Sequence, residues 1–261
     1  MKLLVTNDDG IDSVFLHELV RALLAAAQEV FVVAPRQEQS WVGAAKSRNR
    51  AVHSGPAEFG LGCPTWVVDG TPSDCVNIAI DHLLPCRPDA VLSGINVGMN
   101  ASLGFIIASG TIAGAWEGAL HGLPAMAFSQ DLSTEMYDHL KDPNTRIDAV
   151  LLATLRAAAG HAARLVPEFA ASCPSGSFIV HNVNFPFPCP VGAQVRRTVP
   201  ARVVVPGLFS PQADDGTHRL IFRAGNDLSP SGLLTDRAAL AAGCISHSVL
   251  DYTRLGALPT P

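Results

Sequence analysis

Short apolar runs alternate with amphipathic segments along residues 1–186, and this alternation constrains the fold more than any other feature of the chain. Apolar runs with the length of buried strands occur at residues 3–6, 30–34, 66–68, 90–93, 125–129 and 178–183. Segments with apolar residues at helical spacing predict helices at residues 15–27, 72–83, 111–121 and 147–165. Elements in this order form a mostly parallel sheet with helices on both faces. The sequence therefore predicts a Rossmann-like α/β fold.

The start of the second predicted helix carries a clear local signal. Thr71 suits the N-cap position, Pro72 the first helical position and Asp74 the third. A Thr followed three residues later by an acid can form a capping box, in which each side chain bonds the other residue's backbone N–H. We therefore expect a helix that begins at Pro72.

The character of the chain changes after residue 186. Pro and Gly become frequent, and alternating stretches at 202–205 and 219–222 are typical of hairpins. A last helix is predicted at 235–242 and a last strand at 244–249. We expect one domain over residues 1–261, with a Rossmann-like core at 1–186 and a C-terminal extension at 187–261 that is exchanged between subunits.

The chain is short of charged residues. Hydrophobic residues make up 48% of the sequence and charged residues 16%, whereas ordinary globular proteins carry about 25% charged residues. Disordered chains need low hydrophobicity and high net charge, so this chain is expected to fold. Its net charge of −5 gives no general basic footprint for nucleic acid. We expect no stable complex with nucleic acid.

The uncharged stretch 90–116 raises the question of a membrane span. Gly, Asn and Ser interrupt it, and backbone breaks of that kind do not span lipid. The apolar run 3–6 is followed almost at once by Asp8 and Asp9, which is not the pattern of a signal peptide. The six cysteines show no C-x-x-C spacing and are expected to be reduced. We expect a soluble, cytoplasmic protein that binds no membrane.

Polar residues follow several of the predicted strands. In an open parallel sheet, ligands bind outside the carboxyl ends of the strands. The polar or small residues at those ends are Asn7, Asp8, Asp9, Ser40, Asn96, Asn100, Ser109, Gly110 and Thr111. The set contains oxygen donors and small residues, with no His and no Cys.

This set of residues suits a cation and an anion in one cleft. The adjacent carboxylates of Asp8 and Asp9 repel each other unless a cation lies between them, and ligation by oxygen alone favours Mg²⁺, Mn²⁺ or Ca²⁺ over Zn²⁺. A helix that opens at Ser109-Gly110-Thr111 offers backbone N–H groups to an anion. A divalent cation beside a phosphate can polarise a phosphoryl oxygen and lower the pKa of bound water. The pattern indicates phosphoryl chemistry.

Ordinary structural roles also explain each part by itself. Asp-Asp-Gly after a strand is a common turn, and Ser and Thr cap most helices. The basic segment 46–50 is typical of a solvated face, although it could also reach a polyanionic substrate. The joint placement of these residues at several strand ends favours the metal–phosphate hypothesis over the separate explanations.

At the level of whole motifs, the sequence resembles the survival protein SurE family of metal-dependent nucleotide phosphatases. The matching motifs are LVTNDDGI (4–11), VVAP (32–35) with Ser40, GTPSDCV (70–76), SGIN (93–96) with Gly98 and Asn100, SGT (109–111), EG (117–118), GLPA (122–125) and NVNFP (182–186). They occur in order through nearly all of residues 1–186, and their combination is highly specific.

The resemblance implies a 5'/3'-nucleotidase that hydrolyses nucleoside monophosphates, with a specificity that can extend to short polyphosphate. It implies one divalent ion, Mg²⁺ or Mn²⁺, and a homodimer or homotetramer that exchanges C-terminal elements. By the same resemblance, Asp8, Asp9, Ser40 and Asn96 bind the metal, and Asn100, Ser109, Gly110 and Thr111 line the phosphate side. Asn7 follows the first strand directly, and we expect it on the substrate side as well. Because Asp8 and Asp9 are adjacent at the end of that strand, our hypothesis is that they are the catalytic residues.

The chain departs from the family pattern at two loops. Before Ser109 the family has a Gly-Asp-containing stretch and a Tyr, whereas this chain has Leu103–Ala108, which contains no acid. The loop around Ser40 carries Trp41. The sequence therefore leaves substrate preference, including any effect of Leu103–Ala108, and the oligomer contacts open.

Other functions remain to be weighed against the nucleotidase. A haloacid-dehalogenase-like phosphatase would use Asp8 as a nucleophile, but it expects Asp-x-Asp-Gly where this chain has Asp-Asp-Gly. A dinucleotide-dependent oxidoreductase needs G-x-G-x-x-G after the first strand, which is not present there. A non-catalytic, metal-stabilised module that binds nucleotide or polyphosphate stays open, as does an aspartyl-phosphate intermediate. Steady-state turnover separates an enzyme from a binding module.

Overall fold

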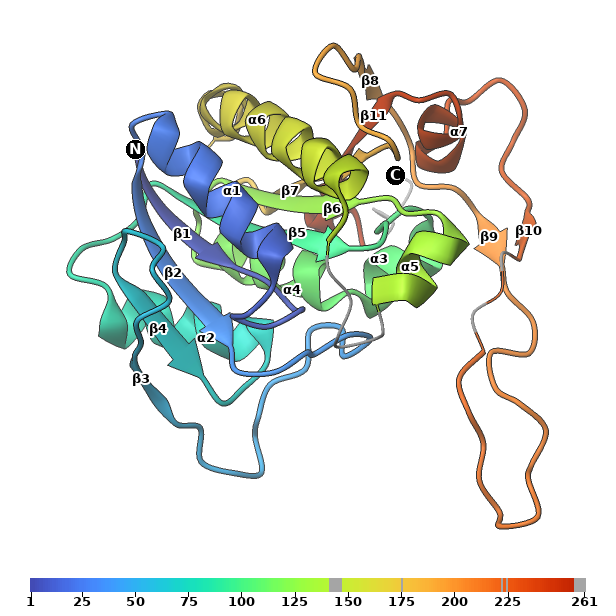
Figure 1. Cartoon of the computed structure of the whole chain (residues 1–261), viewed down its shortest axis with the longest axis horizontal. Helices are drawn as coiled ribbons and strands as arrows, with labels where there is room; N and C mark the ends of the chain where they lie inside the picture. The colour runs from blue at the N-terminus through green and yellow to red at the C-terminus, as the bar shows by residue number, and fades with distance from the viewer. Residues whose placement is uncertain (141–146, 175, 222, 224, 256–261) are drawn as a thin grey trace, which may run out of the picture.

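The computed structural model describes residues 1–140, 147–174, 176–221, 223 and 225–255. A nine-stranded sheet runs through it in the order β3-β4-β2-β1-β5-β6-β7-β11-β8, with a separate pair formed by β9 and β10 (Figure 1). The strands are β1 (Lys2–Thr6), β2 (Glu29–Pro35), β3 (Ser54–Pro56), β4 (Thr65–Val68), β5 (Ala90–Val97), β6 (Ala125–Gln130), β7 (Ile179–Phe185), β8 (Val195–Arg197), β9 (Val203–Val204), β10 (Asn226–Asp227) and β11 (Ile245–Asp251).

Helices connect most of the strands. They are α1 (Val14–Ala25), α2 (Pro72–Ile78), a π-helical turn (Ala79–Leu83), α3 (Leu103–Ala108), α4 (Gly110–Leu120), α5 (Thr134–Leu140), α6 (Ala149–Ser172), α7 (Asp236–Ala241) and a 3₁₀ turn (Tyr252–Arg254). The first turn of α2 has the expected capping box. The Thr71 hydroxyl accepts from the Asp74 N–H at 3.2 Å, and the Asp74 carboxylate accepts from the Thr71 N–H at 2.9 Å.

The centre of the sheet is parallel and fully buried. β1 pairs in parallel with β2 on one side and β5 on the other, and β6 and β7 continue the parallel order. Leu3, Leu4 and Val5 are completely buried, as expected for a strand covered on both faces. The antiparallel pairs of this sheet lie away from its centre: β3 pairs with β4 at one edge, and β11 pairs with β7, while the other edge strand, β8, is parallel to β11. The predicted α/β class with a mostly parallel sheet is confirmed.

Two layers of helices cover the sheet. α1 and α6 pack against each other on one face, and α2 and α4 pack together on the other (Figure 1). The larger apolar cluster lies under α1 and α6 and includes Leu16, Leu19 and Val166, all completely buried. This arrangement fixes the carboxyl ends of β1, β2 and β5 at one edge, next to the start of α4.

Helix α6 is the one helix among the described residues that is long and apolar enough to cross a membrane by length and composition alone. It packs on α1 and β6, and 56% of its most apolar window is buried inside the protein. A buried core helix has the same composition, so its apolar face is accounted for by packing.

The predicted boundaries and the structure differ in a few places. β5 continues four residues past the predicted end at residue 93, and α6 continues to Ser172 rather than 165. The segment Leu103–Ala108, which we expected to be a loop, forms α3, and α5 was not expected. Both helices have fewer than eight residues. A helix of that length contains too few residues to show a helical repeat of apolar positions, and its stability depends on tertiary contacts.

Both stretches of the C-terminal extension that are typical of hairpins pair in antiparallel fashion. β9, inside the predicted stretch 202–205, pairs with β10 at residues 226–227. In the stretch 219–222, Leu220 forms an isolated antiparallel bridge with Phe209, flanked by backbone hydrogen bonds from Ser210 to Arg219 and from Ile221 to Leu208, and residue 222 lies outside the described residues. The connection between β9 and β10 projects from the body of the protein, while β8 and β11 complete the edge of the main sheet (Figure 1).

Candidate metal and phosphate site

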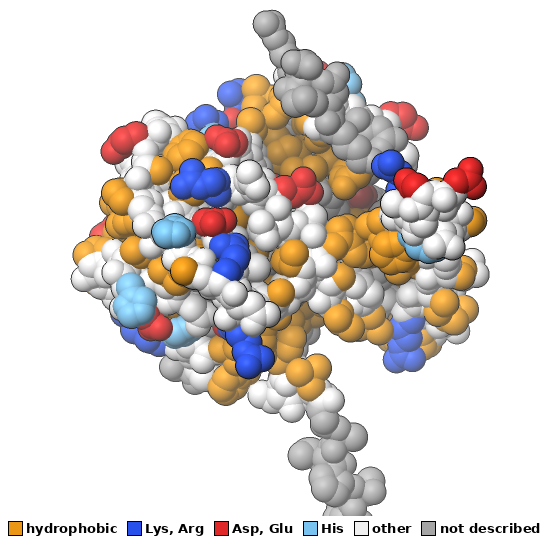
Figure 2. Space-filling view, turned by 90° about the horizontal axis from the view of Figure 1, so that it is seen from below, with side chains coloured by type: hydrophobic (Ala, Val, Ile, Leu, Met, Phe, Trp, Pro, Cys, Tyr) orange, Lys and Arg blue, Asp and Glu red, His pale blue; other side chains and the backbone are white. Residues whose placement is uncertain are grey.

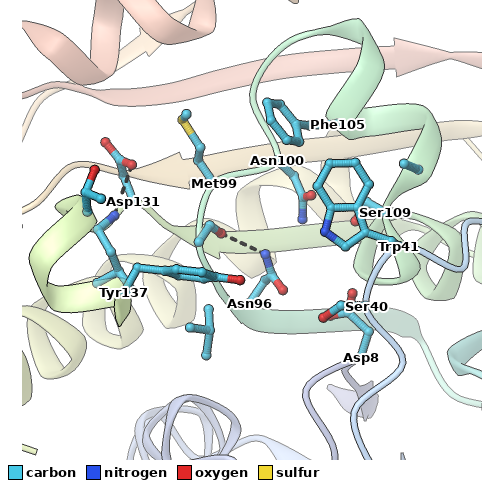
Figure 3. Close-up of a pocket in the computed structure, with 15 residues that line it drawn as sticks. Asp8, Ser40, Trp41, Asn96, Met99, Asn100, Phe105, Ser109, Asp131 and Tyr137 are labelled. Carbon is cyan, nitrogen blue, oxygen red and sulfur yellow. Dashed lines mark hydrogen bonds between the residues drawn. The ribbon is translucent and has the colours of Figure 1, made fainter. Parts of the chain in front are cut away.

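A cavity of about 440 Å³ opens where the ends of β1 and β5 meet the loop after β2 and the start of α4. Asp8, Ser40, Asn96, Asn100 and Ser109 line it together (Figure 3). These residues are far apart in the sequence, and the parallel register of β1 with β5 brings their segments to one edge. The rule that ligands bind at the carboxyl ends of the strands therefore located the cavity correctly.

Asp8 is buried at the bottom of this cavity, with 3% of its surface exposed. The Thr111 hydroxyl donates to Asp8 Oδ1 at 2.6 Å, and the Gln39 N–H donates to the Asp8 carbonyl at 2.7 Å. Burial raises the pKa of the Asp8 carboxyl to about 6, against the opposing effect of the Thr111 hydrogen bond. Asp8 is thus held in one orientation at some electrostatic cost.

Asp9 adds a second carboxylate beside it. The Val97 N–H donates to Asp9 Oδ2 at 3.0 Å, which links the end of β1 to the end of β5. Burial, and then the charge of Asp8, hold the pKa of Asp9 well above its usual range. The nearby Glu38 carboxylate also raises the pKa of both residues. The two adjacent carboxylates of Asp8 and Asp9 favour a bound cation, because a cation relieves their mutual repulsion.

Two neutral oxygen donors complete the predicted ligand set. Asn96 donates through Nδ2 to the Gly98 carbonyl at 2.7 Å, which leaves its side-chain oxygen as the group that can bind a cation. Ser40 lines the cavity, and its hydroxyl donates to Glu38 Oε1 at 2.7 Å, so its oxygen can still act as a ligand. Within the described residues, no group of three or more His, Cys, Asp and Glu side chains is placed to hold a metal. A site here depends on two carboxylates and neutral oxygens, which suits a hard divalent cation.

The start of α4 packs directly behind Asp8. Ser109 is the N-cap, lines the cavity, and accepts from the Ile112 N–H at 3.0 Å. A Cβ at Gly110 would lie 2.8 Å from Asp8 Cβ, so only glycine allows the helix to approach so closely. Thr111 is completely buried, and its hydroxyl donates the hydrogen bond to Asp8 described above. Of these three predicted phosphate-side residues, the structure places Ser109 on the cavity and the other two against Asp8.

Asn100 lies on the cavity, whereas Asn7 lies in the protein interior. Asn100 lines the cavity, and its Nδ2 donates to Ser129 Oγ at 2.9 Å. Asn184 accepts from the Asn100 N–H at 2.7 Å, and Asn182 donates to the Asn100 carbonyl at 2.9 Å. Asn7 is completely buried and donates to the Gly10 carbonyl at 2.8 Å, so it shapes the turn after β1.

Several residues of the site were not assigned a role from the sequence. Glu38 contributes charge, and Asn182 and Asn184 hold the Asn100 backbone. The signal for the two asparagines was available, since polar residues at alternate positions of a buried strand require partners. Trp41, Phe105, Asp131 and Tyr137 also line the cavity. Trp41 and Phe105 lie on one side, and Asp131 and Tyr137 on the other (Figure 3). Phe105 and Tyr137 come from short helices that the sequence pattern did not predict.

Fold and site together define a class: an α/β protein whose strand ends bring carboxylate, amide and hydroxyl oxygens together next to the N-terminus of a helix. The sequence matches the family described as survival protein SurE over residues 3–204. The chain belongs to the SurE family.

Individual relatives agree with this assignment. The chain is 33% identical over 236 residues to a 5'-nucleotidase SurE of Desulforudis audaxviator, covering 89% of this chain and 83% of the relative. It is 44% identical over 200 residues to a 5'-nucleotidase SurE 1 of Thermus thermophilus, covering 76% and 71%. The crystal structure of the SurE protein from Aquifex aeolicus superimposes with a TM-score of 0.69 at 25% identity, covering 98% of this chain and 97% of that one.

Proposed function

We propose that the protein is a divalent-metal-dependent phosphomonoesterase that hydrolyses nucleoside 5'- or 3'-monophosphates to nucleoside and phosphate. The observation that carries the proposal is the pair of adjacent carboxylates at the end of β1: Asp8 lines the same cavity as Asn96 and Ser109, and the charge of Asp8 helps to raise the pKa of Asp9. Relatives named 5'-nucleotidase support the choice of substrate.

Asp8, Asp9, Ser40 and Asn96 would hold one Mg²⁺ or Mn²⁺ ion. Such an ion, when bound, polarises a phosphoryl oxygen and lowers the pKa of water. The donor set fits it, because all four side chains supply oxygen and two supply the negative charge.

The chain's own groups then account for orientation and proton transfer. The Ser109 hydroxyl accepts from Ile112, so its hydrogen can be donated to a phosphoryl oxygen of the substrate. Thr111 holds Asp8 in place, and Val97 does the same for Asp9. A carboxyl group with a raised pKa is suited to take a proton from the attacking water, and Asp8 and Asp9, whose pKa values are both raised by burial, are the candidates.

The proposal is tested by phosphate release from AMP with Mg²⁺ or Mn²⁺. Replacing Asp9 with Asn removes one ligand charge and should lower the rate by at least about a hundredfold. Asp12→Asn is the matched control, because Asp12 is exposed in the same loop. Full activity of the Asp9→Asn variant would contradict the assignment. Binding of AMP by wild-type protein with no release of phosphate would favour a non-catalytic binding module.

The proposal extends to assembly and location. The protein would be a cytoplasmic homodimer or homotetramer that exchanges residues 187–261 between subunits. Apolar side chains are exposed along this extension, including Val204, Phe209, Leu228 and Leu233, and Figure 2 shows apolar patches on this side of the molecule. Exposed apolar patches mark association surfaces. A strict monomer by light scattering at micromolar concentration would contradict this part, and activity on tripolyphosphate would test the extension to polyphosphate.

A further inference from the structure

The cavity is lined by both polar and aromatic side chains. Asp8, Asn96 and Ser109 are among the polar ones, and Trp41 and Tyr137 lie on opposite sides of Asn96 (Figure 3). Trp41 is 42% exposed and Tyr137 is 38% exposed. Large aromatic side chains exposed around a cavity are unfavourable in water and mark a surface that binds a ligand.

The aromatic side chains on one side of the opening form a fixed wall. The rings of Trp41 and Phe105 meet edge to face with their centroids 5.5 Å apart. The Arg237 guanidinium lies over the Phe105 ring, 5.3 Å from its centroid, so Phe105 interacts with both Trp41 and Arg237. The Gly43 N–H also donates to the Ala108 carbonyl at 2.9 Å, which ties the Trp41 loop to the end of α3. The wall is therefore built before any ligand binds.

Tyr137 faces this wall from the other side of the opening. It comes from α5, and Figure 3 shows its ring on the far side of Asn96 from Trp41. Aromatic side chains from three separate elements thus surround the space that leads down to Asp8. A cavity of about 440 Å³ lies within the usual range for small-molecule sites.

On the basis of the proposed nucleotidase function, we infer that Trp41, Phe105 and Tyr137 form the seat for the nucleobase of the substrate. The base stacks on the wall of Trp41 and Phe105, while the phosphate lies near Ser109. Stacking tolerates different bases, because every base has a π-face. These residues therefore select nucleotides over phosphate esters that lack a base, without selecting strongly among the bases.

The decisive comparison is between AMP and ribose 5-phosphate, which carries the same phosphate on the same sugar without a base. Wild-type protein should have a higher kcat/KM for AMP. Trp41→Ala should lower the ratio of the two kcat/KM values by about 5- to 150-fold, the range expected for one base–aromatic stack. The loss should be in KM for AMP, and Trp41→Phe should retain most of the ratio because it keeps an aromatic face.

The control for this comparison is Ile107→Ala. Ile107 is 77% exposed on the same short helix as Phe105, and it is not among the residues that line the cavity. The inference is overturned if wild-type protein hydrolyses AMP and ribose 5-phosphate with equal kcat/KM. It is also overturned if the ratio for Trp41→Ala stays within about twofold of wild type. Thermal unfolding of each variant shows whether it is folded.

A binding measurement separates this inference from the proposed function. If wild-type protein releases phosphate from neither compound, the nucleotidase proposal fails, but the seat can still be tested with adenosine. Calorimetric binding of adenosine that is weakened in Trp41→Ala and retained in Ile107→Ala supports the seat. Absence of adenosine binding by the wild-type protein overturns it.

Discussion

Asp236 connects the C-terminal extension to the loop that carries Asn100. It is completely buried at the first position of α7, and its carboxylate accepts three backbone hydrogen bonds. Oδ2 accepts from the Ser102 N–H at 2.8 Å, and Oδ1 accepts from the N–H groups of Ala201 and Arg237 at 3.0 and 2.8 Å. Because Ser102 is only two residues after Asn100, this carboxylate supports the geometry of the site from a distant part of the chain.

The expected cost of removing Asp236 follows from these bonds. In Asp236→Ala the buried N–H groups of Ser102 and Ala201 lose their acceptor, and each unpaired donor costs about 1–3 kcal/mol, so the free energy of unfolding should fall by roughly 2–6 kcal/mol. In Asp236→Asn the amide oxygen can still accept from the Ala201 N–H, while the NH₂ group faces the Ser102 N–H and cannot accept from it. The free energy of unfolding of that variant should fall by about 1–3 kcal/mol.

Urea unfolding followed by tryptophan fluorescence measures both changes. Asp214→Ala is the control, because Asp214 is fully exposed in the extension and should change the free energy of unfolding by less than about 0.5 kcal/mol. Phosphate release from AMP should fall in both Asp236 variants under conditions where they remain folded. The reasoning is refuted if Asp236→Ala is as stable as the control, or if Asp236→Asn is the less stable of the two variants.

Two further predictions concern the packing behind Asp8 and a buried histidine pair. Gly110→Ala would place a Cβ 2.8 Å from Asp8 Cβ and should lower the rate of phosphate release at least about tenfold. The control is Gly104→Ala, whose Cβ would meet nothing within 4 Å, and it should leave the rate unchanged. Equal rates for the two variants would contradict the packing argument. His181 Nδ1 lies 2.9 Å from His247 Nε2, and burial lowers the pKa of His181 to about 4 and that of His247 to about 3. The pKa of a histidine in the unfolded chain is about 6.5, so below that pH the unfolded chain binds more protons than the folded protein. The free energy of unfolding should therefore fall by roughly 2–5 kcal/mol between pH 7 and pH 4.5. In urea titrations at the two pH values, His247→Gln should show a smaller difference in the free energy of unfolding than the wild-type protein. The same difference in both proteins would count against the histidine pair as its source.

The central strands and the start of α2 could be predicted from the sequence. The central strands were recognisable because each is a short run of apolar residues buried on both faces, as in β1 and β5. The capping box at Thr71 located the start of α2 to the residue. In a parallel sheet the carboxyl ends of β1 and β5 lie at the same edge, so the sequence could place Asp8 and Asn96 at that edge, and the pairing of β1 with β5 then brings them together.

What the sequence could not predict depends on contacts between distant segments. α3 has six residues, and its position rests on the burial of Ile106 and on the link from Ser102 to Asp236, 134 residues away. Neither contact leaves a periodic pattern. For the same reason the wall of Trp41 and Phe105 was not expected, since it needs both the loop after β2 and the position of α3. The pairing of β9 with β10 likewise depends on register rather than composition.

The central claim is that Asp8 and Asp9 hold a divalent cation that phosphate release requires. It is tested most directly by measuring phosphate release from AMP with protein stripped of metal by a chelator, before and after the addition of Mg²⁺ or Mn²⁺. The account predicts negligible release by the stripped protein and full recovery on adding either ion. It also predicts little recovery by Asp9→Asn at the same concentration. Equal release with and without metal would contradict the account.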